Sequence, residues 1–428
     1  MDENSYTVIG SGINSYFFIK TLLKRKIKVN LVDKNIINFE QKKNKENPTF
    51  KNNISPKVYL NNFERNIQEF IKKNNFVYNN FNTQSALSFG GLSNIWGGSI
   101  YKFNKHDLYR NNLQNLSIYK YLKELKSYDL KIEKNLQNKF FEKNLNTKNY
   151  EIVYNWKLIN HSGKPFSAQK EILHLIKSKK INFIPGILKN IDKKINSYNL
   201  TIDNGNRIFK LKTSKLILGA GSLSTTKLLM KLMQIKKVRL LCTPLTQQVI
   251  IASEKRFGTD LSAILSLNEK KNTSFSCHLI PLSGLDNELF LDHLNLNKFF
   301  FNSLITKVKP YLYAVYSYLN SDYSNITIEN LNDKFLVKGF DNDLDVASNH
   351  KLFNSGIFNI PGSKKKLLQG NDNHIGGSFP LKEYFTGLNE LKKYENLHVI
   401  DGTYLNYIPA LGYTLTTILN SIRIAKKI

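Results

Sequence analysis

The feature that most constrains the fold is a glycine turn after a short apolar segment near the start of the sequence. Residues 6–9 read YTVI, residues 10–12 read GSG, and residues 14–24 carry apolar side chains at helical spacing. A second apolar segment at 28–32 is followed by Asp33. This order predicts a strand, a tight turn, a helix and a second strand, which together form a βαβ unit with parallel strands.

Each part of this unit has a physical role in binding a pyrophosphate. Gly10 permits the turn, Gly12 lets backbone N–H groups approach an anion, and the N-terminus of the helix supplies partial positive charge. Ser15 replaces the usual third glycine and is small enough for close packing of helix on strand. Asp33, 21 positions after Gly12, can accept hydrogen bonds from a ribose. The unit therefore predicts a dinucleotide-binding site.

Length and charge constrain the class of protein further. A chain of 428 residues with 41% hydrophobic residues can bury a large core, either in two domains or in one domain with a large insertion. The formal net charge is +29, but the lysines are scattered along a sequence that is rich in Lys, Asn and Ile throughout. We therefore expect no specific nucleic-acid partner, and only a weak attraction to anionic membrane surfaces at low salt.

The cellular compartment is predicted from what the sequence lacks. Cys242 and Cys277 form neither a metal-ligand spacing nor a disulfide framework, which favours a reducing compartment and no bound metal. The N-terminal residues MDENSYTVIGSG do not resemble a secretion signal. No run approaches the ~18 apolar residues of a membrane span. We expect a protein that is cytoplasmic or peripheral to a membrane.

Three further glycine-containing segments accompany the first turn. Residues 89–98 read FGGLSNIWGG, which suits a backbone pressed against a ligand beside a flat aromatic wall. Residues 216–222 read LILGAGS, an apolar segment that ends in a second glycine turn before a helix. The C-terminal part contains HIGGS at 374–378, LHVIDGT at 397–403, and Pro409 ahead of the last helix.

These segments, in this order, resemble the glucose-methanol-choline (GMC) oxidoreductases. The resemblance covers about the first 35 residues, 85–100, 180–230 and 370–428. It implies a bound FAD, with the loop at 89–98 around the ribitol and pyrophosphate and the turn at 216–222 near the adenine. The residues that it places at FAD, besides Gly10, Gly12, Ser15 and Asp33, are Gly91, Ser93, Asn94, Trp96, Gly97, Gly98, Ala220, Gly221, Asp401, Gly402 and Thr414.

The resemblance also implies an activity. His374 would be the general base that removes a proton from the CH–OH group of an alcohol or sugar-like substrate, while hydride passes to flavin N5. The electron acceptor is unknown, and a dehydrogenase is favoured over an oxidase. His398 is expected to be structural.

The sequence departs from the family pattern at two positions. Some relatives attach FAD through a histidine in the loop at 89–98, where this chain has Ile95, so we expect non-covalent FAD. Relatives commonly have a second His or Asn at the position of Gly412. Tyr413 is the first candidate to replace it, with Tyr407 and Asn406 as others. The alternative is an FAD-binding protein without redox turnover.

The expected architecture is α/β, with a discontinuous Rossmann-type FAD-binding domain and an inserted α+β substrate domain on a mostly antiparallel sheet. The FAD-binding domain would span 1–235 with helical excursions, the substrate domain 236–395, and the return to the first domain 396–428. Helices are expected at about 61–73, at 414–427 and in an apolar stretch at 296–319. The charged stretch at 105–150 reads as largely helical.

Overall fold

The structure is a computed structural model of the chain. It describes residues 5–34, 60–83, 85–94, 96, 98–101, 105–117, 123, 125, 131–134, 143–145, 148, 150–153, 155–160, 163–253, 265–269, 275–282, 307–340, 357–360, 363–372 and 374–428.

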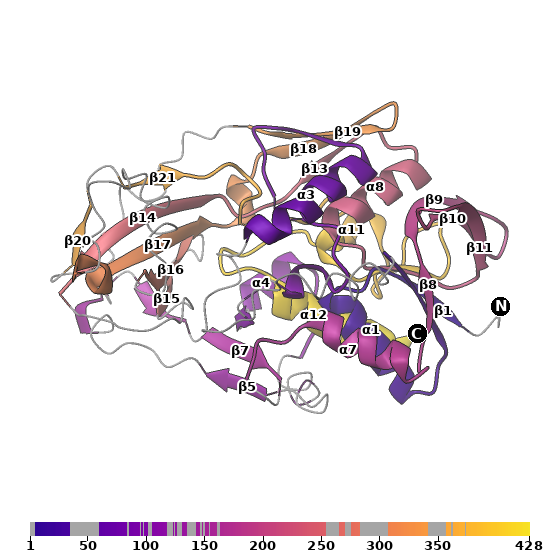
Figure 1. Ribbon diagram of the computed structural model, residues 1–428, viewed down its shortest axis with the longest axis horizontal. Coiled ribbons are helices and arrows are strands. Elements are labelled where there is room, and N and C mark those ends of the chain that lie inside the picture. The colour runs from indigo at the N-terminus through magenta and orange to yellow at the C-terminus, as the bar shows by residue number, and fades with distance from the viewer. Residues whose placement is uncertain are drawn as a thin grey trace.

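A five-stranded parallel sheet lies at one end of the molecule (Figure 1). Its strands, in spatial order, are β22 (Leu397–Val399), β12 (Leu216–Leu218), β1 (Tyr6–Ile9), β2 (Val29–Asp33) and β8 (Asn182–Pro185). The short central strands are apolar and almost wholly buried, as expected for a parallel sheet covered on both faces. Because its strands come from distant parts of the chain, this unit is discontinuous, as the sequence predicts.

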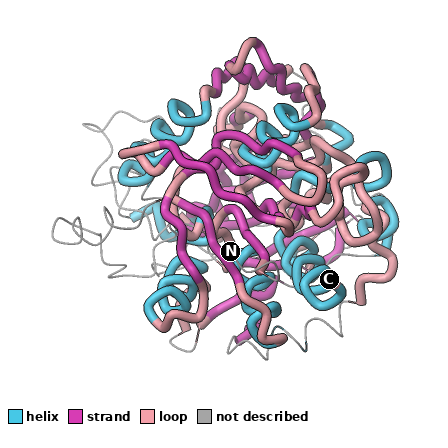
Figure 2. The backbone as a smooth tube through the Cα atoms, turned by 90° about the vertical axis from the view of Figure 1, so that its right-hand side faces the viewer, coloured by secondary structure: helices cyan, strands magenta, loops and turns pink. Residues whose placement is uncertain are grey.

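Helices α1 (Ile13–Lys24), α7 (Ala168–Lys177) and α12 (Thr414–Lys427) lie side by side next to this sheet (Figures 1 and 2). Helix α1 buries Tyr16, Phe17, Phe18, Ile19 and Leu22. The guanidinium of Arg25, just beyond α1, donates a hydrogen bond of 2.6 Å to the carbonyl oxygen of Ala425 in α12. The end of the chain is thereby held against its beginning.

A seven-stranded antiparallel sheet forms the opposite end of the molecule (Figure 1). Its order is β20 (Ile357–Asn359), β14 (Leu245–Ala252), β17 (Leu312–Leu319), β16 (Phe275–Pro281), β15 (Leu265–Glu269) and β6 (Tyr150–Ile152), with β21 (Lys365–Lys366) paired to β14. One face carries a core that includes Phe275, Tyr313 and Val315.

Three smaller sheets complete the described architecture. The first contains β13 (Lys237–Leu240), β18 (Ile326–Leu331), β19 (Lys334–Gly339) and β3 (Phe76–Asn79). The second contains β11 (Ile208–Thr213), β10 (Tyr198–Asp203) and β9 (Ile187–Lys193). The third contains β4 (Ser99–Tyr101), β7 (Asn155–Ile159) and β5 (Lys131–Lys134). The remaining helices are α3 (Leu60–Asn74), α4 (Lys105–Arg110), α8 (Ser222–Leu232) and α11 (Leu381–Tyr384). The 3-10 helices are η3 (Gly91–Asn94), η4 (Lys309–Tyr311), η5 (Ser321–Tyr323) and η6 (Gly402–Tyr404).

The expected helices at 61–73 and 414–427 are confirmed by α3 and α12. The expected helix at 296–319 is wrong for residues 312–319, which form strand β17 between β14 and β16; residues 296–306 lie outside the described residues. The pairing of β17 with a strand on each side overrides the helical pattern of its sequence. Tyr313 and Val315 face the core of the seven-stranded sheet, and Tyr316 and Tyr318 face the opposite side of that sheet. Strands β5 and β6 likewise interrupt the largely helical stretch expected at 105–150.

Candidate active site

The first glycine turn is packed against the end of strand β12. Gly10 has φ +91°, and a Cβ on it would lie 2.5 Å from the carbonyl oxygen of Gly219, so this position accepts only glycine. Ser15 is buried with its Oγ 3.5 Å from the same carbonyl oxygen. Ala220 follows immediately, with its Cα 2.7 Å from the Cβ that Gly10 lacks. The first and third glycine segments are therefore neighbours in space.

Gly12 contrasts with Gly10, because its missing side chain faces open space. A Cβ on Gly12 or on Gly221 would meet no atom of the described residues within 4 Å. The buried Oδ1 of Asn14, in the first turn of α1, has no hydrogen-bond partner among the described residues. Open space and an unpaired polar atom at a helix N-terminus fit the pyrophosphate of a dinucleotide.

Asp33 ends strand β2 beside this turn. Its carboxylate accepts hydrogen bonds from the backbone N–H groups of Ser11 and Lys34, both at 2.6 Å. Burial raises the pKa of Asp33, although the hydrogen bond from Ser11 opposes this rise. An ionised carboxylate has about four acceptor positions. The two backbone N–H groups and the side chain of Ser11 occupy three of them, which leaves one for a ribose hydroxyl. Asp33 thus has a structural role in addition to the predicted binding role.

The loop at 89–98 lies directly on the first glycine turn. The backbone N–H of Gly90 donates to Oγ of Ser11 at 2.7 Å, across 79 positions of the sequence. A Cβ on Gly91 would lie 3.5 Å from Cα of Gly12. The second and first glycine segments therefore line one region.

The polar side chains of this loop bond to the segment 166–168. Oγ of Ser93 accepts from the N–H of Ala168 at 3.0 Å, Oδ1 of Asn94 from the hydroxyl of Ser167 at 2.9 Å, and the indole of Trp96 donates to the carbonyl oxygen of Phe166 at 2.6 Å. Contacts from this loop to a cofactor would therefore come mainly from its backbone. Gly98 has φ +74°, whereas Ile95 and Gly97 lie outside the described residues.

Asp401 lies at the end of β22 and is buried. Its Oδ2 accepts from the hydroxyl of Thr225 in α8 at 2.5 Å, and its Oδ1 accepts from the backbone N–H of Thr403 at 3.0 Å. Burial raises the pKa of Asp401. Gly402 is tightly packed, since a Cβ on Gly376 would lie 2.4 Å from its carbonyl oxygen. The carboxylate of Asp401 is thus committed to joining β22 to α8.

His374 is half-buried and is held by two residues that the sequence reading did not identify. Its Nδ1 lies 3.2 Å from Oγ1 of Thr243 and 3.9 Å from Oδ2 of Asp372. The backbone N–H of Thr243 donates to the same Oδ2 at 2.8 Å, and so does the hydroxyl of Thr243. Burial raises the pKa of Asp372 to about 6.

Gly412 lies against the other ring nitrogen of His374. A Cβ on Gly412 would be 2.6 Å from Nε2, and Gly412 has φ +85°. A second His or Asn side chain at this position would force the imidazole of His374 to move, because that imidazole fills the space. Thr414, two residues on, begins helix α12.

Two of the three candidates to replace that second residue donate hydrogen bonds to backbone carbonyl oxygens, whereas the buried hydroxyl of Tyr407 has no hydrogen-bond partner among the described residues. Tyr413 lies beside His374, with ring centroids 6.0 Å apart, but its hydroxyl donates to the carbonyl oxygen of Ile375 at 2.7 Å, and burial raises its pKa. The side-chain amide of Asn406 donates to the carbonyl oxygen of Arg110 at 3.1 Å. The ring of Tyr407 packs 3.9 Å beneath the Arg110 guanidinium.

Aromatic side chains of the seven-stranded sheet approach His374 from the other side. The ring of Tyr318 lies 6.1 Å from that of His374 and 5.1 Å from that of His278. Nδ1 of His278 is 3.1 Å from the hydroxyl of Tyr101. Strand alternation could have grouped Tyr316 with Tyr318, but no sequence signal links either to His374.

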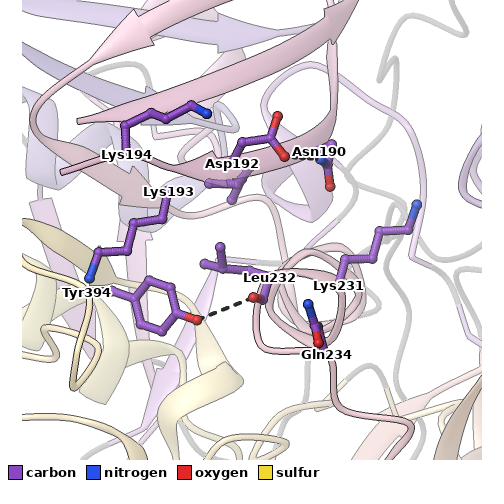
Figure 3. Close-up of a pocket in the computed structure, with 9 residues that line it drawn as sticks. Asn190, Asp192, Lys193, Lys194, Lys231, Leu232, Gln234 and Tyr394 are labelled. Atoms are coloured by element: carbon purple, nitrogen blue, oxygen red, sulfur yellow. Dashed lines mark hydrogen bonds between the residues drawn. The ribbon is translucent and has the colours of Figure 1, made fainter. Parts of the chain in front are cut away.

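A separate hollow lies in another part of the described chain. A hollow of about 430 Å³ between β9 and the end of α8 is lined by Lys193, Lys194, Lys231 and Tyr394 and contains none of the candidate site residues (Figure 3). Among the described residues, no group of three or more His, Cys, Asp or Glu side chains could hold a metal ion. No described helix is long and apolar enough to cross a membrane.

The two cysteines are free and buried. Burial raises the pKa of Cys277 to about 12 and that of Cys242 well above its usual value. Both thiols are therefore protonated and unreactive at neutral pH. His398 is also buried, with Nδ1 3.0 Å from the carbonyl oxygen of Leu388 and a pKa lowered by burial.

The fold and the site together define a mixed α/β protein with a parallel sheet, several antiparallel sheets and a dinucleotide-type glycine turn. A crystal structure of pyridoxine 4-oxidase from Mesorbium loti matches it with a TM-score of 0.67, over 99% of this chain and 98% of that chain, at 11% sequence identity. This likeness confirms the expected fold class. The sequence matches no protein-family model and no curated protein.

Proposed function

We propose that the protein is an FAD-dependent oxidoreductase that oxidises the CH–OH group of an alcohol or sugar-like substrate. The observation that carries this proposal is the meeting of three glycine segments around the open space at the N-terminus of α1. A fold shared along nearly the whole chain with an enzyme named for oxidising pyridoxine at position 4 supports it. A hydroxymethyl group on a ring is therefore the first substrate type to test.

In this proposal FAD is held without a covalent bond. Backbone groups around Gly12 and Gly221 would border the pyrophosphate, and the remaining acceptor position of Asp33 would receive a ribose hydroxyl. Asp401 would act through the adjacent backbone, because its carboxylate already accepts hydrogen bonds from Thr225 and Thr403. When bound, FAD would supply the acceptor for the hydride at its N5 atom.

The protein's part of the reaction would centre on His374. Its Nε2 is the ring nitrogen that does not face Thr243, so it is the atom to take the hydroxyl proton of the substrate. Tyr318 and His278 would form the wall that faces the substrate from the seven-stranded sheet. Tyr413 fits proton transfer poorly, because its hydroxyl is committed to Ile375 and its pKa is raised.

In a second candidate function, the protein binds FAD but does not catalyse redox turnover. The contact between Gly412 and His374 favours it, because with His374 in this position the site has room for only one of the two polar residues that relatives commonly use. Several other points stay predictions from the sequence. They are the electron acceptor, the domain limits at 235 and 395, a cytoplasmic location, a weak attraction to anionic membranes and the lack of a specific nucleic-acid partner.

Two measurements on the purified protein test the proposal. The absorption spectrum should have flavin bands, and their absence after supply of FAD would contradict the cofactor. Anaerobic mixing with a panel of ring-borne and aliphatic primary alcohols and sugars should bleach these bands. Stable flavin bands that no member of the panel bleaches would favour the second candidate. Reoxidation with oxygen or with a quinone then separates an oxidase from a dehydrogenase.

A further inference from the structure

Asp372 and Thr243 form a hydrogen-bonded pair directly behind His374. Oδ2 of Asp372 lies within bonding distance of three donors: the backbone N–H of Thr243 at 2.8 Å, the backbone N–H of His374 at 3.2 Å, and the hydroxyl of Thr243. The side chain of Asp372 is about 1% exposed, whereas that of His374 is 26% exposed. The carboxylate is therefore a buried anchor, and the imidazole is the member of the group that solvent or a substrate can reach.

We infer that Thr243 and Asp372 are positioning residues that hold His374 as the tautomer with its proton on Nδ1, so that Nε2 is the basic atom. A threonine hydroxyl has a single proton. When that proton is donated to Asp372, the oxygen of Thr243 can only accept a hydrogen bond from its other neighbour. That neighbour is Nδ1 of His374, at 3.2 Å, which must then carry the proton.

The carboxylate fixes the direction of this chain of hydrogen bonds. An ionised carboxylate accepts hydrogen bonds and donates none. Burial raises the pKa of Asp372 to about 6, which still leaves the group mostly ionised at pH 7.5. Two backbone N–H donors on the same oxygen hold it in place. The direction therefore runs from imidazole to hydroxyl to carboxylate.

This arrangement has a consequence at Nε2. A neutral imidazole has one N–H, so a proton on Nδ1 leaves a lone pair on Nε2. When Nε2 accepts a proton, the nearby carboxylate, 3.9 Å from Nδ1, stabilises the positive charge. The use of this lone pair in alcohol oxidation rests on the proposed function, whereas the tautomer itself does not.

The tautomer can be measured directly by nitrogen NMR of the full-length protein labelled with ¹⁵N-histidine, at pH 7.5. The signals of His374 are identified by their loss in His374→Gln. We expect a pyrrole-type shift for Nδ1 and a pyridine-type shift for Nε2. Thr243→Ser should keep this pattern, because it keeps the hydroxyl. Thr243→Val and Asp372→Asn should move His374 toward the opposite tautomer or a mixture.

Thr21→Val is the matched control, because Thr21 is also buried and its hydroxyl donates to the carbonyl oxygen of Phe17, far along the chain from His374. This variant should leave the His374 signals unchanged. The inference is overturned if wild-type His374 carries its proton on Nε2, or if Thr243→Val keeps the wild-type pattern. Should Thr243→Val fail to fold, the comparison of wild type with Thr243→Ser and Asp372→Asn gives the same decision.

A second readout connects the tautomer to the proposed function. With an alcohol that bleaches the flavin, flavin reduction in Thr243→Val should be at least about tenfold slower than in wild type. The rate of flavin reduction in Thr243→Ser should stay within about twofold of the wild-type rate. Equal rates for wild type and Thr243→Val would refute the positioning role. If no alcohol bleaches the wild-type flavin, the proposed function fails, and the NMR measurement still decides the tautomer.

Discussion

Gly412 packs so closely against His374 that a Cβ on Gly412 would lie 2.6 Å from Nε2 of the imidazole. We expect Gly412→Ala to destabilise the protein and to displace His374. A residue other than glycine at φ +85° costs about 1–2 kcal/mol, and the collision adds to this cost. The bound flavin should be retained, since this contact is made with His374 and not with the glycine turns.

Gly163→Ala is the control for this variant. Gly163 has φ +73°, yet a Cβ there would meet no described atom within 4 Å, so it reports the conformational cost alone. Chemical denaturation of both variants, together with anaerobic flavin reduction, gives the comparison. Equal stability and equal reduction rates for the two variants would mean that the contact between Gly412 and His374 has no consequence.

We expect Gly12→Val to abolish FAD binding without unfolding the protein. A Cβ at Gly12 meets no atom in the part of the chain that the structure describes, so the side chain would occupy the space proposed for the pyrophosphate. Asp33→Ala should only weaken binding, by about 1.5–3 kcal/mol for the loss of a charge-assisted hydrogen bond. Gly10→Ala should instead destabilise the fold. Circular dichroism and flavin occupancy separate these effects, and full occupancy in Gly12→Val would contradict the assignment of the turn.

We expect the flavin to leave the polypeptide on acid precipitation. The position that some GMC relatives use for covalent attachment is Ile95, which has no nucleophilic side chain, and the sequence from 89 to 98 contains no histidine. The absorbance of the supernatant and of the redissolved pellet is the measurement. Flavin that stays in the pellet after washing with denaturant would show a covalent bond.

We expect His374→Ala to keep FAD and the fold but to slow flavin reduction by about 10²–10⁴, the usual contribution of a general base. Tyr413→Phe is the comparison, because it removes the hydroxyl that donates to the carbonyl oxygen of Ile375 and should cost about 1 kcal/mol of stability with little effect on reduction. Stopped-flow absorbance over a pH series measures both. Loss of flavin from His374→Ala would instead make His374 structural.

Lys227 gives a prediction about stability and pH. It is buried in α8, its Nζ lies 3.2 Å from Oδ1 of Asn74, and burial lowers its pKa to about 7 from 10.5. Between these two values the unfolded chain binds the proton more tightly than the folded protein. Stability due to Lys227 is therefore lost as pH falls from about 10.5 to about 7.

Lys227→Met removes this proton linkage, so its gain in stability over wild type should be largest near pH 7 and should vanish above pH 10.5. The order of magnitude is roughly 2–4 kcal/mol at pH 7. Lys231→Met is the comparison, because Lys231 lies on the same helix, is partly exposed and pairs with Asp333 at 2.7 Å. Its charge helps to lower the pKa of Lys227, so its removal should weaken the pH dependence without abolishing it. Urea denaturation at several pH values measures both variants. A gain that does not depend on pH would contradict the shifted pKa of Lys227.

The sequence by itself determined the features that depend on neighbouring residues. The βαβ unit from Tyr6 to Asp33 was predicted because a glycine turn and apolar periodicity act over a few residues, and the final helix at 414–427 was predicted for the same reason. The turn at Gly10 belongs to the same group, whereas the close contact of Gly10 with Gly219 depends on packing.

Only the tertiary structure decided the features that depend on distant pairing. Strand β17 was expected to be helical, because the sequence of 312–319 does not reveal that β14 and β16 pair on both sides of it. Thr243 and Asp372 have no sequence signal that connects them to His374, although the three side chains meet in the fold. Hydrogen bonds and contacts between residues far apart in the chain are set by packing and strand register, which local propensity does not encode.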